Sequence, residues 1–185
     1  RYSYRLITEY IDGAISSNEL LNYLEILGLN PSVVDKNNDD IIFELEIPAN
    51  RGYLLSLLGV VREVVPFINA SVKIPPLTFE ETSTKIVPVK IEDKNDCAYY
   101  SCRVVENVSV KKTETFLKNR IEKLGYRSSL NVVDISNYVM AEIGQPLHIF
   151  DLDRVEQYVE VRRARKGETL VTIDGKKRDL DESVM

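Results

Sequence analysis

The residues best suited to chemistry lie in the segment 131–151, which holds the only histidine of the chain, His148. A Ser136–Asn137 pair precedes this histidine, and a Gly144–Gln145–Pro146 turn separates the pair from it. A hydroxyl, an amide and an imidazole together could hold an ester carbonyl and a water molecule. Because imidazole titrates near pH ~6.5, it can act as a base or a donor at neutral pH. The pattern therefore makes Ser136, Asn137 and His148 candidate catalytic groups.

The same residues also have plainer explanations. A lone histidine is more often a structural hydrogen-bond donor, and Asn137 could bind the backbone of the turn. Asp134 and Asp151 suit helix caps better than catalysis. The residue types alone therefore leave the catalytic and the structural interpretations open.

Several other kinds of site are missing from the sequence. Gly13, Gly28 and Gly52 are isolated, so no glycine-rich phosphate loop is present. One histidine with Cys97 and Cys102 is too small a set for a zinc site, and no serine stands in a nucleophile elbow. We therefore expect no metal ligands in this chain.

Composition points to a globular protein. The chain has 185 residues, of which 44% are hydrophobic and 29% charged, and no apolar run approaches the roughly 18 residues that span a bilayer. Two cysteines are too few for a disulfide framework, which favours the cytoplasm and no membrane partner. A net charge of −5 argues against binding nucleic acid through charge alone. We interpret the basic clusters at 111–123, 162–166 and 176–178 as solvated surface.

The first third of the chain predicts a small α/β unit. Ser16 and Glu19 form a capping-box pattern, and the apolar spacing after them predicts a helix ending at Gly28. Residues 35–40 are predicted to be a polar loop, and residues 41–47 alternate as a strand does. A second, deeply buried helix is predicted over 53–67, with Asn50 as its N-cap. Prolines at 75 and 76 mark a linker within 69–85.

The rest of the chain predicts mixed elements. Thr113 caps a helix that stops at Gly125, a further helix covers 131–143, and Asp174–Gly175 indicates a hairpin turn. Strands are predicted at 86–91, 99–106, 146–150, 158–164 and 169–173. The predicted fold class is α+β: a small two-layer α/β N-terminal domain (1–75), a linker (76–85) and part of a mixed-sheet domain (86–185).

Several motifs, in this order along the chain, resemble the β subunit of bacterial phenylalanyl-tRNA synthetase. Residues 48–64 are similar to its Asn-Arg turn and long helix. Residues 131–140 (NVVDISNYVM) and 144–151 (GQPLHIFD) resemble the signature of its editing domain, and residues 161–175 are similar to the segment after that signature. The resemblance covers nearly the whole chain.

The resemblance implies a function. The family's enzyme is an α₂β₂ ligase that joins phenylalanine to tRNA(Phe) with ATP and magnesium. Its α subunit carries the aminoacylation site, and its β subunit binds tRNA and hydrolyses mischarged tyrosyl-tRNA at an editing site. By resemblance, Ser136, Asn137 and His148 are catalytic residues of that pocket, and Gln145 and Pro146 bind the substrate. The implied partners are the α subunit and the 3′ end of tRNA(Phe), with no cofactor in this part.

The sequence also departs from the family pattern. Ser136 stands where threonine is usual, Ile149 where alanine is usual, and Tyr53 where aspartate is usual. A short loop over 31–40 replaces an OB-like tRNA-binding module. We expect the chain, ending at Met185, to be a fragment that lacks the second half of the editing domain, and to be inactive alone.

Two other functions stay open. The chain could belong to a non-catalytic binding or assembly module that kept the fold and lost the activity. It could instead derive from a freestanding editing-like hydrolase that acts on aminoacyl esters. Deacylation by the whole parent protein distinguishes these possibilities.

Overall fold

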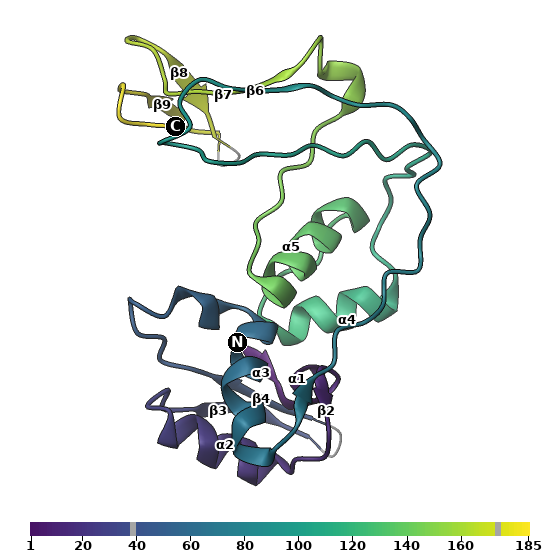
Figure 1. Cartoon of the computed structure of the whole chain (residues 1–185), viewed down its shortest axis with the longest axis vertical. Helices are drawn as coiled ribbons and strands as arrows, with labels where there is room; N and C mark the ends of the chain where they lie inside the picture. Colours follow the sequence, from purple (N-terminus) through teal and green to yellow (C-terminus); the bar gives the residue numbers. More distant parts are fainter. Residues whose placement is uncertain (38–39, 173–174) are drawn as a thin grey trace. The chain divides into compact units, whose positions relative to one another are not determined.

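The computed structural model describes residues 1–37, 40–172 and 175–185. The chain forms two compact units, each made of two segments. The first unit comprises Arg1–Phe79 and Ser109–Ile149, and the second comprises Glu80–Val108 and Phe150–Met185. Helices and several small sheets confirm the α+β fold class (Figure 1). The division into domains at residues 75 and 86 stays a prediction.

A three-stranded antiparallel sheet lies in the first unit. Its order is β1 (Tyr2–Ser3), β4 (Ile41–Glu44) and β3 (Ser32–Lys36). The predicted loop at 35–40 is wrong at its start, because Asp35 and Lys36 pair with Ile42 and Ile41. Residues 38 and 39 of that loop lie outside the described residues. Strand β4 is shorter than the predicted 41–47.

The first helices agree with their local signals. Helix α1 (Tyr4–Thr8) is capped by Ser3, and α2 (Ser17–Ile26) by the capping box of Ser16 and Glu19, which confirms that prediction. Gly28 has φ +74°, a left-handed conformation that glycine adopts without strain. It therefore ends this helical segment as predicted.

The second predicted helix is divided into three parts. They are the 3₁₀ turn η1 (Gly52–Leu55), helix α3 (Leu57–Val64) and the 3₁₀ turn η2 (Val65–Ile68). Asn50 is not its cap: Ser56 takes an extended conformation, and its Oγ accepts from the Gly59 N–H at 3.1 Å. The predicted deep burial is confirmed, because most of α3 is inaccessible to solvent.

Replacement of Ser56 by alanine is expected to lower the free energy of unfolding by about 1–2 kcal/mol. The buried Ser56 Oγ also donates to the Tyr53 carbonyl at 2.9 Å, so the change removes two hydrogen bonds. Urea denaturation monitored by circular dichroism measures the effect. Ser71→Ala, at an exposed serine of the same unit, is the control. Equal midpoints for the two variants would contradict the capping role.

A small antiparallel pair covers the start of the predicted linker. Strand β2 (Ile11–Asp12) pairs with β5 (Ser71–Val72). The linker prediction over 69–85 is therefore wrong at 71–72. The backbone there is hydrogen-bonded to β2 within the first unit, and the Lys73 N–H adds a further bond by donating to the Tyr10 carbonyl at 2.8 Å.

Helices α4 (Thr115–Lys123) and α5 (Asn131–Ile143) complete the first unit, and they lie side by side (Figure 1). The predicted bounds of α5 are confirmed. Thr113 is not the cap of α4, because its hydroxyl donates to Asp134 instead. Gly125 comes just after α4 and has φ +86°, as the predicted stop requires. The apolar core of the unit includes Leu124 and Ala141.

The second unit holds two small two-stranded sheets. Strand β6 (Val89–Ile91) pairs in parallel with β7 (Val159–Val161), and β8 (Thr169–Val171) pairs antiparallel with β9 (Lys177–Asp179). The short 3₁₀ turn η3 (Leu152–Arg154) precedes β7. The expected hairpin pairing is present, although Asp174 of its predicted turn lies outside the described residues.

The predicted strands at 99–106 and 146–150 do not form in this structure. A strand at 146–150 would place Leu147 and Ile149 on one face and His148 and Phe150 on the other, but residues 146 to 150 are all exposed. A strand needs a neighbouring backbone to complete its hydrogen bonds, and sequence alternation does not supply one. Among the described residues, no helix is both long and apolar enough to cross a membrane.

Candidate functional site

Helix α5 carries the first part of the candidate site. Ser136 and Asn137 are both half-buried on this helix. The Ser136 hydroxyl donates to the Val133 carbonyl one turn earlier, at 2.7 Å. Consecutive helical residues point roughly 100° apart, so the two side chains leave the helix in different directions. In the structure, the hydroxyl of Ser136 is therefore hydrogen-bonded within its own helix.

The turn after α5 carries the rest. Gly144 is the C-cap in a left-handed conformation, φ +83°, which lets the chain reverse its course. Gln145 is exposed, and its Nε2 donates to the Pro146 carbonyl at 3.4 Å. His148 is exposed four residues after the C-cap. The hydrogen bonds of Ser136 and Gln145 are local, so they do not by themselves gather the predicted residues around one point.

A cavity of about 370 Å³ lies beside this turn, within the first unit. Pro146 is the predicted site residue that lines it. Its other walls include Tyr2, Leu57, Tyr126, Met140 and Gly144. The cavity thus lies between the end of α5 and residues of the N-terminal part of the unit.

A second set of polar residues on α5 makes contacts that were not predicted from the sequence. Asp134, Tyr138 and Glu142 recur every four residues, and each binds a residue outside the helix. Asp134 is fully buried at the first turn. It accepts from the Ser128 hydroxyl at 2.7 Å, from the Ser129 N–H at 3.1 Å and from Thr113. The four-residue spacing was visible in the sequence, but the partners were not.

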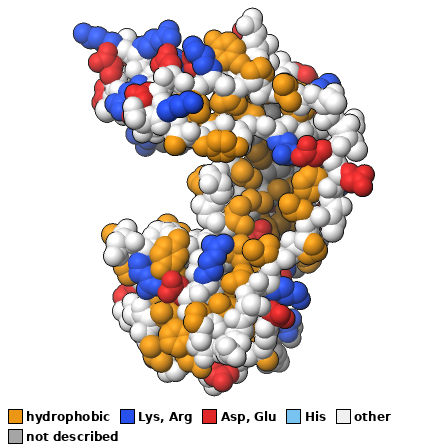
Figure 2. All heavy atoms as spheres, viewed as in Figure 1, with side chains coloured by type: hydrophobic (Ala, Val, Ile, Leu, Met, Phe, Trp, Pro, Cys, Tyr) orange, Lys and Arg blue, Asp and Glu red, His pale blue; other side chains and the backbone are white. Residues whose placement is uncertain are grey.

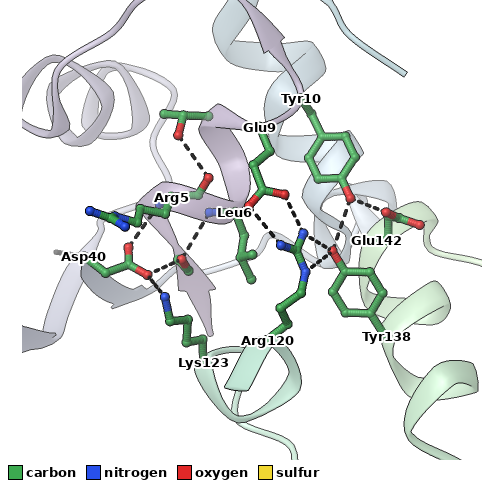
Figure 3. Close-up of polar contacts among 11 residues, drawn as sticks. Arg5, Leu6, Glu9, Tyr10, Asp40, Arg120, Lys123, Tyr138 and Glu142 are labelled. Carbon is green, nitrogen blue, oxygen red and sulfur yellow. Dashed lines mark hydrogen bonds and ion pairs between the residues drawn. The ribbon is translucent and has the colours of Figure 1, made fainter. Parts of the chain in front are cut away.

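Tyr138 and Glu142 belong to a hydrogen-bond network that includes Arg120 and Tyr10 (Figure 3). Arg120 donates to the Tyr138 hydroxyl from Nε at 3.0 Å and from a terminal nitrogen at 2.6 Å. Its two terminal nitrogens also reach the Glu9 carboxylate at 2.9 and 2.5 Å. The Tyr10 hydroxyl lies 3.2 Å from that of Tyr138 and donates to Glu142.

Burial and hydrogen bonding shift the pKa values of these groups. Burial raises the pKa of Tyr10, and its bonds to Glu142 and Tyr138 raise it further, so the phenol stays protonated at neutral pH. Burial alone would lower the pKa of Arg120. The bonds to Glu9 and Tyr138 outweigh it, so the pKa of Arg120 is raised. Both groups therefore keep a fixed charge state throughout the physiological range.

The basic clusters pair largely with acids of the same chain. On α4, Lys118 lies 3.9 Å from Glu122, and Lys123 lies 2.7 Å from Asp40. In the second unit, Arg162 binds Glu168 at 2.7 Å, and basic and acidic side chains alternate around β8 and β9 (Figure 2). This mixture is consistent with an ion-paired surface. Among the described residues, no three His, Cys, Asp or Glu side chains gather as metal ligands would.

Comparison with known proteins identifies the family. The B3/4 domain family matches residues 96–185. A phenylalanine–tRNA ligase beta subunit from Fusobacterium nucleatum is 45% identical over 147 residues, covering 78% of this chain and 18% of the relative. The corresponding subunits of Aquifex aeolicus and Rhodopirellula baltica are 41% identical over 162 residues and 34% identical over 185 residues. This chain belongs to the phenylalanine–tRNA ligase beta subunit family.

The match confirms the resemblance seen in the motifs. It covers 87% of this chain and 19% of the Aquifex subunit, and 98% of this chain and 27% of the Rhodopirellula subunit. The chain therefore spans about a fifth to a quarter of the phenylalanine–tRNA ligase beta subunits that it matches. The B3/4 match begins within the second unit and includes α4 and α5, so it draws on both compact units.

Proposed function

We propose that this chain forms part of the beta subunit of a phenylalanine–tRNA ligase and contributes to the hydrolysis of tyrosyl-tRNA(Phe) there. The observation that carries the proposal is the family match, at 34–45% identity over most of the chain. The parent enzyme would use ATP and magnesium to aminoacylate tRNA(Phe). Its alpha subunit and the 3′ end of the tRNA would be the partners of this subunit, in an α₂β₂ assembly in the cytoplasm.

The exposed position of His148 supports a role in hydrolysis. An imidazole open to solvent can take a proton from a water molecule that attacks the ester bond. Ser136 and Asn137 would orient the ester, provided that the Ser136 hydroxyl leaves the Val133 carbonyl. Selection for tyrosine would come from a hydrogen bond to its hydroxyl. When phenylalanine binds, the polar group of the pocket that would pair with the hydroxyl has no partner.

One observation favours a second function. The Ser136 hydroxyl is engaged by its own helix at 2.7 Å, which is a structural use of the side chain. A non-catalytic module that binds or assembles other parts of the ligase would need no more than that. Deacylation by the whole ligase distinguishes the two functions.

Replacement of His148 by alanine in the whole ligase is expected to slow tyrosyl-tRNA deacylation roughly a hundredfold or more. Phenylalanylation should stay nearly unchanged, and tyrosyl-tRNA should accumulate. The measurement is the release of labelled tyrosine from preformed tyrosyl-tRNA(Phe), with Gln157→Ala, at an exposed residue outside the candidate site, as the control. Proofreading at the wild-type rate would remove His148 from the site.

The same assay applied to the 185-residue chain tests whether the chain can deacylate tyrosyl-tRNA without the rest of the ligase. If the whole ligase deacylates and this chain does not, the editing pocket needs residues from elsewhere in the enzyme. If neither deacylates, the non-catalytic function is supported instead.

A further inference from the structure

A polar stripe runs along one face of α5. Asp134, Tyr138 and Glu142 are spaced four residues apart, so they lie on the same side of the helix in successive turns. Each of the three is bound by a residue from another part of the first unit. The helix is therefore held at its start, its middle and its end by polar contacts on a single face.

The middle and the end of the stripe share one network (Figure 3). Arg120 of α4 donates twice to the Tyr138 hydroxyl, and its guanidinium lies 5.1 Å from the centre of the Tyr138 ring. Glu9, just after α1, holds the other edge of the guanidinium. Tyr10 then connects the Tyr138 hydroxyl to the Glu142 carboxylate.

The protons of this network have one consistent arrangement. The Tyr10 hydroxyl has a single proton, which it donates to the Glu142 carboxylate. Between the two tyrosines, Tyr138 must therefore be the donor and Tyr10 the acceptor. Arg120 donates to Tyr138, Tyr138 to Tyr10, and Tyr10 to Glu142. A cation at one end and an anion at the other polarise every bond in the same direction, which strengthens the series.

These contacts fix the rotation of α5 about its own axis. A helix bound at one point can still turn, whereas bonds at several successive turns of one face prevent it. Ser136 lies roughly 200° around the helix from Asp134, on the opposite face, and Asn137 adjoins Tyr138 in sequence. Any rotation that moves Tyr138 therefore moves both candidate site residues.

We propose that Tyr138 and Glu142, held by Arg120 and Tyr10, are positioning residues that set the orientation of α5 and so the placement of Ser136 and Asn137. The proposal rests on the proposed editing function for its effect on catalysis. The positioning residues touch no reacting atom themselves. They act by keeping α5, and with it Ser136 and Asn137, in one orientation about the helix axis.

The orientation is tested first on the 185-residue chain by hydrogen–deuterium exchange. Tyr138→Phe keeps the ring and removes the hydroxyl, so the amides of 135–143 should exchange about tenfold faster. Tyr4→Phe is the matched control. It removes a half-buried tyrosine hydroxyl that donates to the Ile15 carbonyl at 2.7 Å, and it makes no bond to α5. Wild-type exchange across α5 in Tyr138→Phe would overturn the proposal.

The effect on the site is tested in the whole ligase. Tyr138→Phe and Glu142→Leu should each lower kcat for tyrosyl-tRNA deacylation about tenfold, because small misplacements of catalytic groups slow reactions strongly. The KM should change little, because the positioning residues are proposed to orient the catalytic groups and to make no contact with the substrate themselves. Glu142→Gln keeps an acceptor for Tyr10 and should restore most of the rate, which loss of stability alone would not predict. Tyr4→Phe should behave as wild type.

The outcomes separate this proposal from the proposed function. If His148→Ala slows deacylation while Tyr138→Phe and Tyr4→Phe are both as fast as wild type, the positioning role is overturned and the editing site stands. If His148→Ala, Tyr138→Phe and Glu142→Leu all leave deacylation unchanged, both the site and the positioning claim fail. Slower deacylation in Tyr138→Phe, with rescue in Glu142→Gln, supports positioning.

Discussion

Replacing Asp134 by alanine is expected to lower the free energy of unfolding by about 2–4 kcal/mol. The carboxylate is fully buried and accepts from the Ser128 hydroxyl, the Ser129 N–H and the Thr113 hydroxyl. It also lies in the first turn of α5, where a negative charge is favoured by the helix dipole. The variant leaves three donors, on the half-buried Thr113 and Ser128 and on the exposed Ser129, without the charged acceptor that binds them in the wild type.

Urea denaturation of the 185-residue chain measures this loss. Asp12→Ala is the matched control, because Asp12 is an exposed aspartate of the same unit. Its expected effect is within about 0.5 kcal/mol of zero, as for other surface substitutions. A midpoint for Asp134→Ala equal to that of Asp12→Ala would show that the buried carboxylate adds nothing to stability.

The role of Asp134 also predicts a pH dependence. Burial alone would raise its pKa, but the hydrogen bonds from Thr113, Ser128 and Ser129 outweigh burial and hold the pKa below its usual range. A lowered pKa in the folded state adds stability that is fully present above the unfolded value of about 3.9 and is lost as pH falls below it. The stability difference between wild type and Asp134→Asn should therefore shrink as the pH falls below about 4.

The second large effect is expected at Lys123, whose replacement by methionine should lower the free energy of unfolding by about 2–3 kcal/mol. Its amine lies 2.7 Å from the Asp40 carboxylate, which is 1% exposed (Figure 3). Asp40 also accepts from the Ser3 hydroxyl at 2.7 Å and the Arg5 N–H at 3.0 Å. Methionine keeps most of the aliphatic chain and removes the charge, so a buried anion loses its counter-ion. Partial exposure of Lys123 reduces the expected loss.

Lys118→Met is the matched control for Lys123→Met. Lys118 is on the same helix, and its exposed partner Glu122 is 3.9 Å away. The two variants should differ in pH response. Burial tends to raise the pKa of Asp40, and the bonds from Lys123, Ser3 and Arg5 lower it overall. Without Lys123, burial should raise the pKa of Asp40 in the folded state, so the ionised carboxylate destabilises the folded protein at neutral pH. The loss of stability in Lys123→Met should therefore diminish on acidification. A loss that does not depend on pH would contradict this explanation.

Elements with complete local signals were predictable from the sequence. Helix α2 carries its own capping box, and α5 combines an apolar period with Gly144 at its end. The start of α3 was not predictable in the same way. Asn50 and Ser56 are both good caps by type, and the extended backbone of Ser56 selects between them. Local propensity identified the helix but not its first residue.

Strands were predicted less well for a physical reason. Residues 99–106 and 146–150 have suitable compositions, but a strand exists only where a second backbone completes its hydrogen bonds. The sequence describes one strand at a time and says nothing about its partner. Strand β6, by contrast, finds β7 some 70 residues later, as the Lys90–Glu160 contact across the pair shows.

The candidate site was predictable only in its residue types. The motif around His148 contains groups that could hydrolyse an ester. That these groups come together in one site stays a prediction. The network that holds α5 was missed because its partners are distant in sequence, with Tyr10 and Tyr138 separated by 128 residues. No local pattern relates these two tyrosines, although the spacing of Asp134, Tyr138 and Glu142 marks one face of the helix.

The packing of α4 and α5 in the first unit has a consequence for how such proteins can be recombined. The segment 80–108 separates Glu9 and Asp40 from Arg120 and Lys123 along the gene, although the two pairs are joined in the fold. A chimera of two relatives with its crossover in that segment takes the acids from one parent and the bases from the other. Such a hybrid should fold well only when both parents carry compatible charges at these positions. Substitutions at the acids and at the bases are therefore expected to be epistatic across the B3/4 boundary.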